Sequence, residues 1–250
     1  MKYEKPQKGN PHGLTINQHS FPVASIMRFA KADGCVSVYL IKQNKEISAK
    51  PDDQLFCAKR TFNQHAESGY MKEIEDKYQV LAEAVVSWSV KTITAKERPI
   101  VTDMFAILNI RAHRRENPIE GYKIDVIDLA RHYTKNEQEQ LEKNHIEFIK
   151  SNFSIPDRHL SYLHGLINLI EVRKQMNDSQ WGILRSSNGQ FIVPDNFSNG
   201  MILPVSPTIC FYSQRNDDVI GVDEVAEINK LAIDSSKNYF FANDLSKCPR

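Results

Sequence analysis

The feature that most constrains the fold of this 250-residue chain is a change in the spacing of its apolar residues. Between residues 66 and 176 they recur mostly at intervals of three and four, as along one face of a helix. From Trp181 to Tyr212, short β-rich runs are separated by Ser, Asn, Gly and Pro. Helices and strands are therefore segregated along the sequence, which predicts an α+β fold rather than a doubly wound sheet.

Helix signals in the middle of the chain are specific enough to give ranges. Residues 66–91 predict one long amphipathic helix, and Pro99 begins the next helical run, which continues to Arg115. A Thr134-x-x-Glu137 capping box precedes an acidic helix over 137–152. Further helices are expected over residues 22–30, 124–133, 157–176 and 223–234. In the helix over 157–176, the apolar stripe is formed by Leu160, Leu163, Ile167 and Ile170.

Strand signals lie on both sides of this helical middle. Residues 35–41 alternate, a turn follows at Asn44-Lys45, and residues 46–49 return, which predicts a β-hairpin. Later strands are expected over 181–184, 190–193, 201–203, 208–212 and 239–241. We expect residues 1–16 to form a flexible N-terminal arm and residues 17–250 to form a single α+β domain: hairpin, helical middle, then mostly antiparallel strands with a late helix.

Charge and cysteine content narrow the class of protein. Lys plus Arg (32) nearly balance Asp plus Glu (31), so net charge gives no reason to expect a membrane surface or nucleic acid, though a local patch could bind one. The same near-neutral charge favours a homo-oligomer or a protein partner. The four cysteines show no metal-binding spacing, and no apolar run is long enough to span a membrane. We therefore expect a cytoplasmic protein with reduced thiols and no membrane segment.

Three residues are candidates for acid–base chemistry. His19 precedes Pro22 by three residues, and an imidazole can donate or accept a proton near neutral pH. Glu75 lies beside the apolar stripe of the helix over 66–91, and Asp195 follows a strand. If the fold brings the three together, they would form a hydrolytic set, or one in which the carboxylates hold Mg²⁺. The alternatives are structural: a histidine that holds the hairpin, a solvated glutamate, and an aspartate that forms a turn.

The densest basic cluster, residues 111–115, is a candidate substrate-binding element. Arg111 and Arg114 could bind phosphate, because guanidinium groups match phosphate oxygens in pairs, and Asn196 is assigned to the same role. Cations near a helix C-terminus are also favoured by the helix dipole alone. A rival site is Arg158 with His164, which resembles the Arg-x(4–6)-His motif of the HEPN ribonucleases. That resemblance implies RNA cleavage without a metal.

Several of these motifs occur in the order found in one family. The stretch His19-x-x-Pro22-x-x-x-Ile26-x-x-Phe29, and later Val193-Pro194-Asp195-Asn196-Phe197, resemble signatures of the domain-of-unknown-function family 4238, a mostly bacterial group. Ile74-Glu75, Phe105 with Arg111, and Pro204-Val205-Ser206-Pro207 also fit. The resemblance spans about residues 17–243. Two departures are Pro194 and Phe197, where the family has a serine and a proline.

The resemblance implies no reaction, since the family has no settled activity. From the residues, the leading hypothesis is a phosphodiester-cleaving, nuclease-like effector of bacterial host–phage conflict, with His19, Glu75 and Asp195 as catalytic groups. Arg111, Arg114 and Asn196 would bind the substrate. The competing hypothesis is a non-catalytic module that binds nucleic acid, a nucleotide or a protein. No metal site is assigned, and Mg²⁺ is the cofactor considered.

Overall fold

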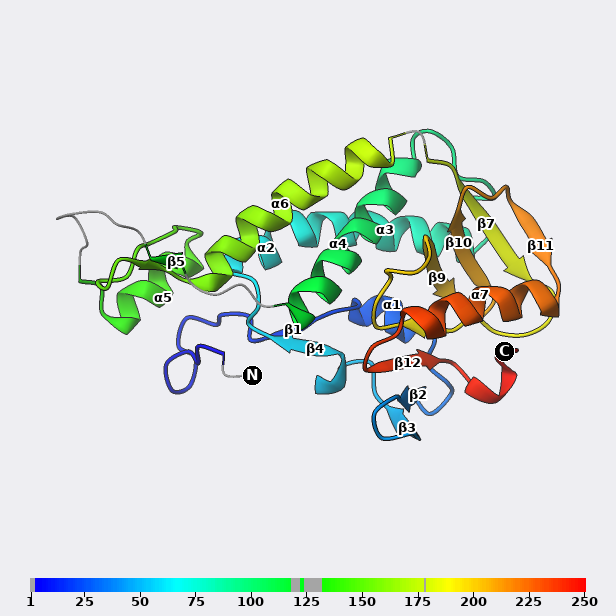
Figure 1. Ribbon diagram of the computed structural model, residues 1–250, viewed down its shortest axis with the longest axis horizontal. Coiled ribbons are helices and arrows are strands. Elements are labelled where there is room, and N and C mark those ends of the chain that lie inside the picture. The colour runs from blue at the N-terminus through cyan, green and yellow to red at the C-terminus, as the bar shows by residue number, and fades with distance from the viewer. Residues whose placement is uncertain (1–2, 118–121, 124–131, 178) are drawn as a thin grey trace.

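The computed structural model describes residues 3–117, 122–123, 132–177 and 179–250, and its fold is α+β. Figure 1 shows α3, α4 and α6 across the middle of the molecule. One four-stranded sheet lies at one end of these helices, with α7 across its face, and a second sheet lies below. The segregation of helices and strands expected from the sequence is thus confirmed.

Each large sheet combines segments from distant parts of the chain. The first has the order β11-β7-β10-β9, in which β7 pairs with β10 antiparallel and with β11 parallel. The second has the order β3-β2-β12-β8, so the N-terminal hairpin pairs with the last strand of the chain. The bounds are β2 Val36–Leu40, β3 Lys45–Ala49, β7 Trp181–Ser186, β8 Val193–Pro194, β9 Ile202–Ser206, β10 Ile209–Ser213, β11 Asp218–Ile220 and β12 Tyr239–Ala242.

Two short strand pairs complete the strands of the described residues. β1 (Asn17–His19) pairs antiparallel with β4 (Cys57–Lys59), and β5 (Tyr122–Lys123) pairs with β6 (Ser154–Ile155). The sequence pattern did not predict these four strands, nor β11, because segments of two or three residues carry no measurable alternation. The pairing of β1 with β4 fixes the position of His19.

The helices follow the expected spacing with one consequential break. They are α1 Val23–Met27, α2 Gln64–Ser68, α3 Tyr70–Val86, α4 Arg98–Glu116, α5 Lys135–Lys143, α6 Asp157–Gln175 and α7 Val222–Ser235. The single helix predicted over 66–91 is divided at Gly69 into α2 and α3. A Cβ atom at Gly69 would lie 2.4 Å from the carbonyl oxygen of His65, so only glycine fits this turn.

Strands β7, β10 and β12 are buried on both faces, which explains the apolar runs near the C-terminus. In β7, Ile183 faces the core that contains α3 and α4, whereas Leu184 faces α7. In β12, Phe241 and Phe240 alternate in the same way. The helix α7 therefore lies between the two sheets, and the period of two along each strand divides the core into two clusters.

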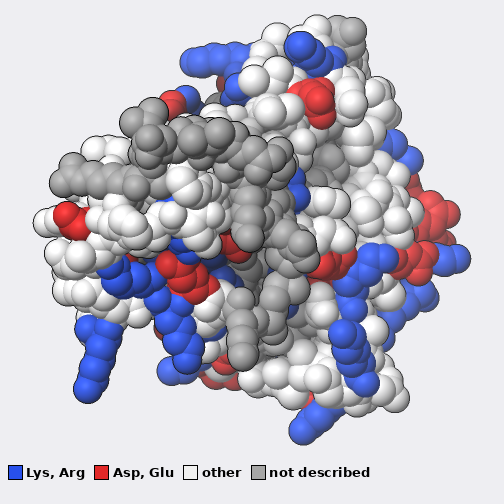
Figure 2. Space-filling model, turned by 60° about the vertical axis from the view of Figure 1, so that its left-hand side comes forward, with Lys and Arg blue, Asp and Glu red and all other residues white. Residues whose placement is uncertain are grey.

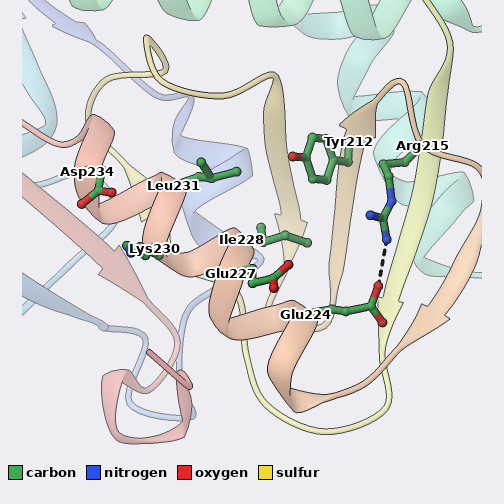
Figure 3. Close-up of a pocket in the computed structure, with 8 residues that line it drawn as sticks. All are labelled: Tyr212, Arg215, Glu224, Glu227, Ile228, Lys230, Leu231 and Asp234. Atoms are coloured by element: carbon green, nitrogen blue, oxygen red, sulfur yellow. Dashed lines mark hydrogen bonds and ion pairs between the residues drawn. The ribbon is translucent and has the colours of Figure 1, made fainter.

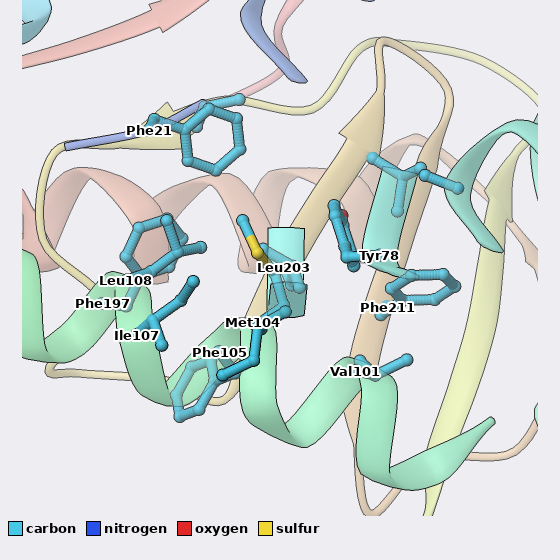
Figure 4. Packing of buried hydrophobic residues seen from close by; sticks show 14 of the residues in the cluster. Phe21, Tyr78, Val101, Met104, Phe105, Ile107, Leu108, Phe197, Leu203 and Phe211 are labelled. Atoms are coloured by element: carbon cyan, nitrogen blue, oxygen red, sulfur yellow. The ribbon is translucent and has the colours of Figure 1, made fainter. Parts of the chain in front are cut away.

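The larger cluster forms around α4, which is apolar on most of its surface. Ten of its 19 residues are buried, so this helix runs through the core rather than along the surface. Figure 4 shows Val101, Met104, Phe105, Ile107 and Leu108 of α4 packed among side chains from the other elements. Those labelled partners are Phe21, Tyr78, Phe197, Leu203 and Phe211. Arg111 lies near the end of this buried helix, and its burial follows from that position.

Two helix predictions need correction and one lies outside the described residues. The capping box at Thr134 and Glu137 is present, but α5 ends at Lys143, because His145 takes a left-handed conformation that interrupts the helix. The expected stripe of α6 is not its packed face: Leu163, Ile167 and Ile170 are 50%, 52% and 49% exposed. The opposite face, with Gly165 among its buried residues, packs on α4. The helix predicted over 124–133 falls largely on residues outside the described ranges.

The N-terminal arm is held by charge. The Glu4 carboxylate lies 2.7 Å from Arg158, 2.6 Å from Lys135 and 3.0 Å from Lys150. Burial alone would raise the pKa of Glu4, but these three cations together hold that pKa below its usual range. Arg158 also forms an ion pair with Glu142. Residues from the start of the chain thus contact α5 and α6.

Candidate functional site

The short antiparallel pairing of β1 with β4 fixes the position of His19. It lies opposite Cys57 in the antiparallel register, so the two side chains are on the same face of the pair. The strand places the imidazole in the electrostatic field of Arg111 on α4 and Glu75 on α3. His19, Glu75 and Arg111, which are far apart in the sequence, therefore belong to one group in the fold.

Arg111 is the centre of this group. Its guanidinium donates a hydrogen bond to Glu75 and lies 3.6 Å from the carboxylate of Glu67. The side chain is only 7% exposed, and its two acidic neighbours are 23% and 10% exposed. Burial lowers the pKa of Arg111, but the two carboxylates outweigh burial and raise it, so the guanidinium stays charged.

The division of the helix at Gly69 explains why two glutamates flank one arginine. Glu67 lies on the last turn of α2, and Glu75 lies in the second turn of α3. Asn63 fixes the start of α2, since its side chain accepts a hydrogen bond from the Ala66 amide. Because α2 and α3 are separate segments, both carboxylates can reach Arg111.

The surroundings of His19 and Glu67 shift their pKa values in opposite directions: the pKa of His19 is lowered, and that of Glu67 is raised. Burial lowers the pKa of His19 below 6.5, and Arg111 lowers it further, against smaller opposing effects from Glu75 and Asp52. Burial raises the pKa of Glu67 above 4.5 more than Arg111 lowers it. A neutral imidazole and a carboxyl group that retains its proton to higher pH are the states required of a base and an acid.

Four shielded polar atoms in this group have no hydrogen-bond partner among the described residues. They are His19 Nε2, Glu67 Oε1, Tyr70 OH and Arg111 Nε. Buried polar atoms are otherwise almost always paired, because an unpaired one costs about 1–3 kcal/mol. Two of these atoms are donors, one is an acceptor, and the imidazole nitrogen can be either. The hydrogen-bonding capacity of these four atoms is therefore unused.

Tyr70 is held in this group by a packing contact with α6. A Cβ atom at Gly165 would lie 2.5 Å from the Tyr70 hydroxyl, so the absence of a side chain at position 165 leaves room for the phenol. Burial raises the pKa of Tyr70 well above 10, and the hydroxyl therefore keeps its proton and can donate it to a hydrogen bond. Gly165 thus has a specific steric role.

Asp195 and Asn196 have other contacts. Asp195 accepts hydrogen bonds from the backbone amides of Lys237 and Asn238, at 2.8 and 3.1 Å, and from the Asn238 side chain at 2.9 Å. Asn196 accepts from the Ser198 amide at 2.9 Å. These bonds hold the chain next to β12, as the structural interpretation of the two residues expects.

The remaining basic candidates divide between two places. Arg114 lies 3.5 Å from the ring of His164 on α6, and its Nε is shielded and unpartnered among the described residues. Arg115 lies 4.0 Å from Asp195. In the HEPN-like pair, Arg158 is 2% exposed and bound to Glu4 and Glu142, whereas His164 is exposed. The structure therefore does not give Arg158 the access to substrate that this motif requires.

A hollow with a lining of mixed polarity lies over α7, away from the group around Arg111. Its volume is about 350 Å³, and Figure 3 shows Arg215 paired with Glu224 at its edge, with Ile228 and Leu231 beside it. Charges of both signs are also interspersed over the face drawn in Figure 2. Neither surface has the convergence of unpaired groups found around Arg111.

The described residues lack two features, a cluster of metal ligands and a membrane-spanning helix. In the ranges given above, no group of three or more His, Cys, Asp and Glu side chains is arranged to hold a metal ion. The same part of the chain contains no helix of sufficient length and apolarity to cross a membrane.

Sequence reasoning did not find Glu67 or Tyr70. Neither has a distinctive spacing, and both flank the break at Gly69, which the helical periodicity concealed. The nearest signal was Asn63, a good N-cap residue four positions before Glu67. The four free cysteines were anticipated; of these, Cys210 and Cys248 are buried, and Cys57 lies beside the site.

Comparison of the chain with protein-family models, with curated proteins and with solved structures finds no match in any of the three. The resemblance to the domain-of-unknown-function family 4238 therefore stays a prediction, based on the motifs quoted above.

Proposed function

We propose that this protein is a phosphodiester-cleaving enzyme that acts on RNA, with His19 as its general base. The observation that carries the proposal is the group of unpartnered shielded atoms around Arg111, which includes the imidazole Nε2. A neutral imidazole with a free nitrogen can accept a proton from a hydroxyl group that approaches it. The cellular role as an effector of host–phage conflict is part of the same proposal.

RNA is the preferred substrate because it carries its own nucleophile. In the proposed step, His19 accepts the proton of a 2′-hydroxyl group, whose oxygen then bonds to the adjacent phosphorus. The bond from phosphorus to the 5′-oxygen breaks, and that oxygen receives a proton from Glu67. The products are a 2′,3′-cyclic phosphate and a 5′-hydroxyl group, so atoms and protons balance.

Arg111 and Tyr70 would stabilise charge rather than transfer protons. Charge accumulates on the phosphoryl oxygens during attack, and a fixed guanidinium in a partly buried site opposes that charge strongly. Arg111 is held in place by Glu75 and retains an unpartnered Nε–H. The Tyr70 hydroxyl offers a second donor. In this proposal Glu75 is a positioning residue for Arg111, and Asp195 is no longer a catalytic group.

The test is an RNA-cleavage assay with a matched histidine control. Wild type, His19→Asn and His113→Asn are incubated with a labelled RNA and with DNA of the same sequence, each with EDTA and with Mg²⁺. His113 is exposed on α4, the same helix as Arg111, and serves as the control. We expect cleavage of RNA alone, a loss of about 10²–10⁴-fold in His19→Asn, and no loss in His113→Asn.

Two results would overturn the proposal: no RNA cleavage by folded wild type, or full activity in His19→Asn.

The second candidate function, a non-catalytic binding module, is favoured by one observation. Asp195, expected to be catalytic, is fully engaged in hydrogen bonds that hold the chain. Binding of RNA by wild type and by His19→Asn, without cleavage by either, would select that alternative.

A further inference from the structure

A basic cavity lies beyond the C-terminal end of α4, next to the turn that Asp195 holds. Its volume is about 390 Å³, and it is lined by Lys42, Arg115, Glu116, Lys237 and Asn238. These residues come from three segments: the turn after β2, the last turn of α4, and the approach to β12. Three cations and one carboxylate therefore face a single hollow.

The pairing of β2 with β12 brings the segments of two of these cations together. Leu40 of β2 pairs with Tyr239 of β12, and the Ile41 amide donates a hydrogen bond to the Asn238 carbonyl group at 3.0 Å. Lys42 follows in the turn after β2, and Lys237 precedes β12, so both lysines line the same cavity.

The carboxylates nearby do not neutralise the two lysines. No hydrogen bond or ion pair joins either ammonium group to another described residue. Asp195 directs its oxygens at the amide groups of Lys237 and Asn238, and Glu116 accepts a weak bond of 3.4 Å from Asn196. Both lysines are exposed, so their ammonium groups are accessible to a ligand.

The helix dipole explains only one of the three cations. Arg115 lies in the last turn of α4, where a positive charge is favoured without any ligand. It also donates to the Tyr239 hydroxyl at 3.3 Å and to the Leu55 carbonyl at 3.4 Å, which fix its direction. Lys42 and Lys237 lie on no helix. An oriented guanidinium beside two free ammonium groups is suited to phosphate oxygens.

We propose that Lys42, Arg115 and Lys237 bind a phosphate group of the nucleic-acid strand, next to the phosphate that is cleaved. This inference rests on the proposed function. Arg115 is one helical turn beyond Arg111, a rise of about 6 Å, comparable with one nucleotide of an extended strand. Arg115 also donates to the carbonyl group of Leu55, two residues before Cys57, the register partner of His19, so Arg115 lies near the strand pair that carries His19.

The experiment measures binding by the full chain, separately from cleavage. The probe is a fluorescent ten-nucleotide RNA with 2′-O-methyl groups, which lacks the attacking hydroxyl, titrated at several salt concentrations. The variant is Lys42→Gln/Lys237→Gln. Its control is Lys91→Gln/Lys96→Gln, which removes the same two charges from an exposed loop between α3 and α4.

We expect the cavity variant to lose roughly tenfold in affinity at moderate salt and to reduce the slope of log affinity against log salt by about 0.7, because one phosphate contact is weakened. The control should retain wild-type affinity and slope. Equal losses in both variants, or none in the cavity variant, would overturn the inference. So would binding of adenosine 5′-monophosphate as tightly as the oligonucleotide, since that result would identify a free-nucleotide site.

Cleavage of unmodified RNA then separates this inference from the proposed function. If wild type cleaves RNA and the cavity variant has an unchanged KM, the cavity inference fails and the nuclease proposal stands. If no variant cleaves but the binding difference holds, the cavity inference stands and the nuclease proposal fails. A raised KM with an unchanged kcat in the cavity variant supports both.

Discussion

Two buried arginine–glutamate clusters in this protein differ in how completely their polar atoms are paired. In the first, Glu142 receives bonds from Arg60 at 2.6 Å and from Arg158 at 2.8 Å, and all three side chains are at most 2% exposed. Among these three residues, only Arg60 Nε is shielded from solvent and lacks a hydrogen-bond partner. In the second, Arg111 Nε and Glu67 Oε1 lack hydrogen-bond partners among the described residues, and the neighbouring His19 Nε2 and Tyr70 OH add two more such atoms.

The two clusters fit different roles under the proposed function. A paired buried cluster fixes the positions of the segments that supply it, here the residue after β4 and the helices α5 and α6, and breaking it exposes uncompensated charge. A partly paired cluster costs stability in the free protein and is retained where a ligand supplies the remaining partners. Both clusters contain an arginine noted in the sequence, and the one around Arg111 has more unpaired polar atoms.

The largest expected effect comes from breaking the paired cluster. Glu142→Ala leaves Arg60 and Arg158 buried with one fewer anion, and we expect a loss of about 3–5 kcal/mol in unfolding free energy. Urea denaturation measures it. Glu83→Ala is the control, because the Glu83 side chain is 66% exposed and pairs with Arg28 at the surface. That control should change stability by less than about 1 kcal/mol. Equal losses of unfolding free energy in Glu142→Ala and Glu83→Ala would show that the buried cluster stabilises the fold no more than the surface pair does.

The next effect tests Asp195, which was expected to act with His19 and whose carboxylate holds the chain before β12. Asp195→Ala removes a carboxylate that accepts three hydrogen bonds, and we expect a loss of about 2–3 kcal/mol in unfolding free energy. The cleavage rate per folded molecule should stay at the wild-type value when it is measured well below the melting temperature. A folded variant without activity would return Asp195 to the catalytic group.

A smaller effect is expected from the cluster around Arg111. Glu67→Gln keeps the shape of the side chain and removes an ionisable group that burial disfavours, so unfolding free energy should change by less than about 1 kcal/mol. Because burial raises the folded-state pKa of Glu67, wild type loses stability relative to the variant as pH rises above 4.5. Urea titrations at pH 4 and pH 7 measure this difference. If wild type and Glu67→Gln differed in unfolding free energy by the same amount at pH 4 and pH 7, the pKa of Glu67 would not be raised by folding.

The smallest effect concerns the pH dependence of His19. Because its folded-state pKa is lowered, the unfolded chain binds the proton more readily, and wild type loses stability relative to His19→Asn as pH falls below 6.5. The same residue sets the acid limb of cleavage: kcat/KM should fall with a midpoint below 6.5. A midpoint above 6.5 would mean that the neutral imidazole is not the form favoured by the fold.

Secondary structure could be predicted from local patterns, whereas the site depended on contacts between distant segments. The capping box at Thr134 defined the start of α5 correctly because capping involves neighbouring residues. Glu75 and Arg111 were named from weak local signals, and the fold pairs them. No pattern linked Glu67 to Arg111, since their contact depends on the break at Gly69. The predicted packing face of α6 was wrong for a related reason. Periodicity shows which residues share a face of a helix, but not which face is covered by the rest of the protein.

The contact between Glu4 and α6 has a consequence for the order of events during synthesis. Glu4 leaves the ribosome long before Arg158, its partner 154 positions later in the chain. Contacts between such distant positions form late, because a long loop must close first. Until α6 has been made, Glu4 and Glu142 lack the Arg158 guanidinium that both of them contact in the native state. We therefore expect the arm to dock last, and a nascent chain that has not completed α6 to remain open to proteases in its first segment.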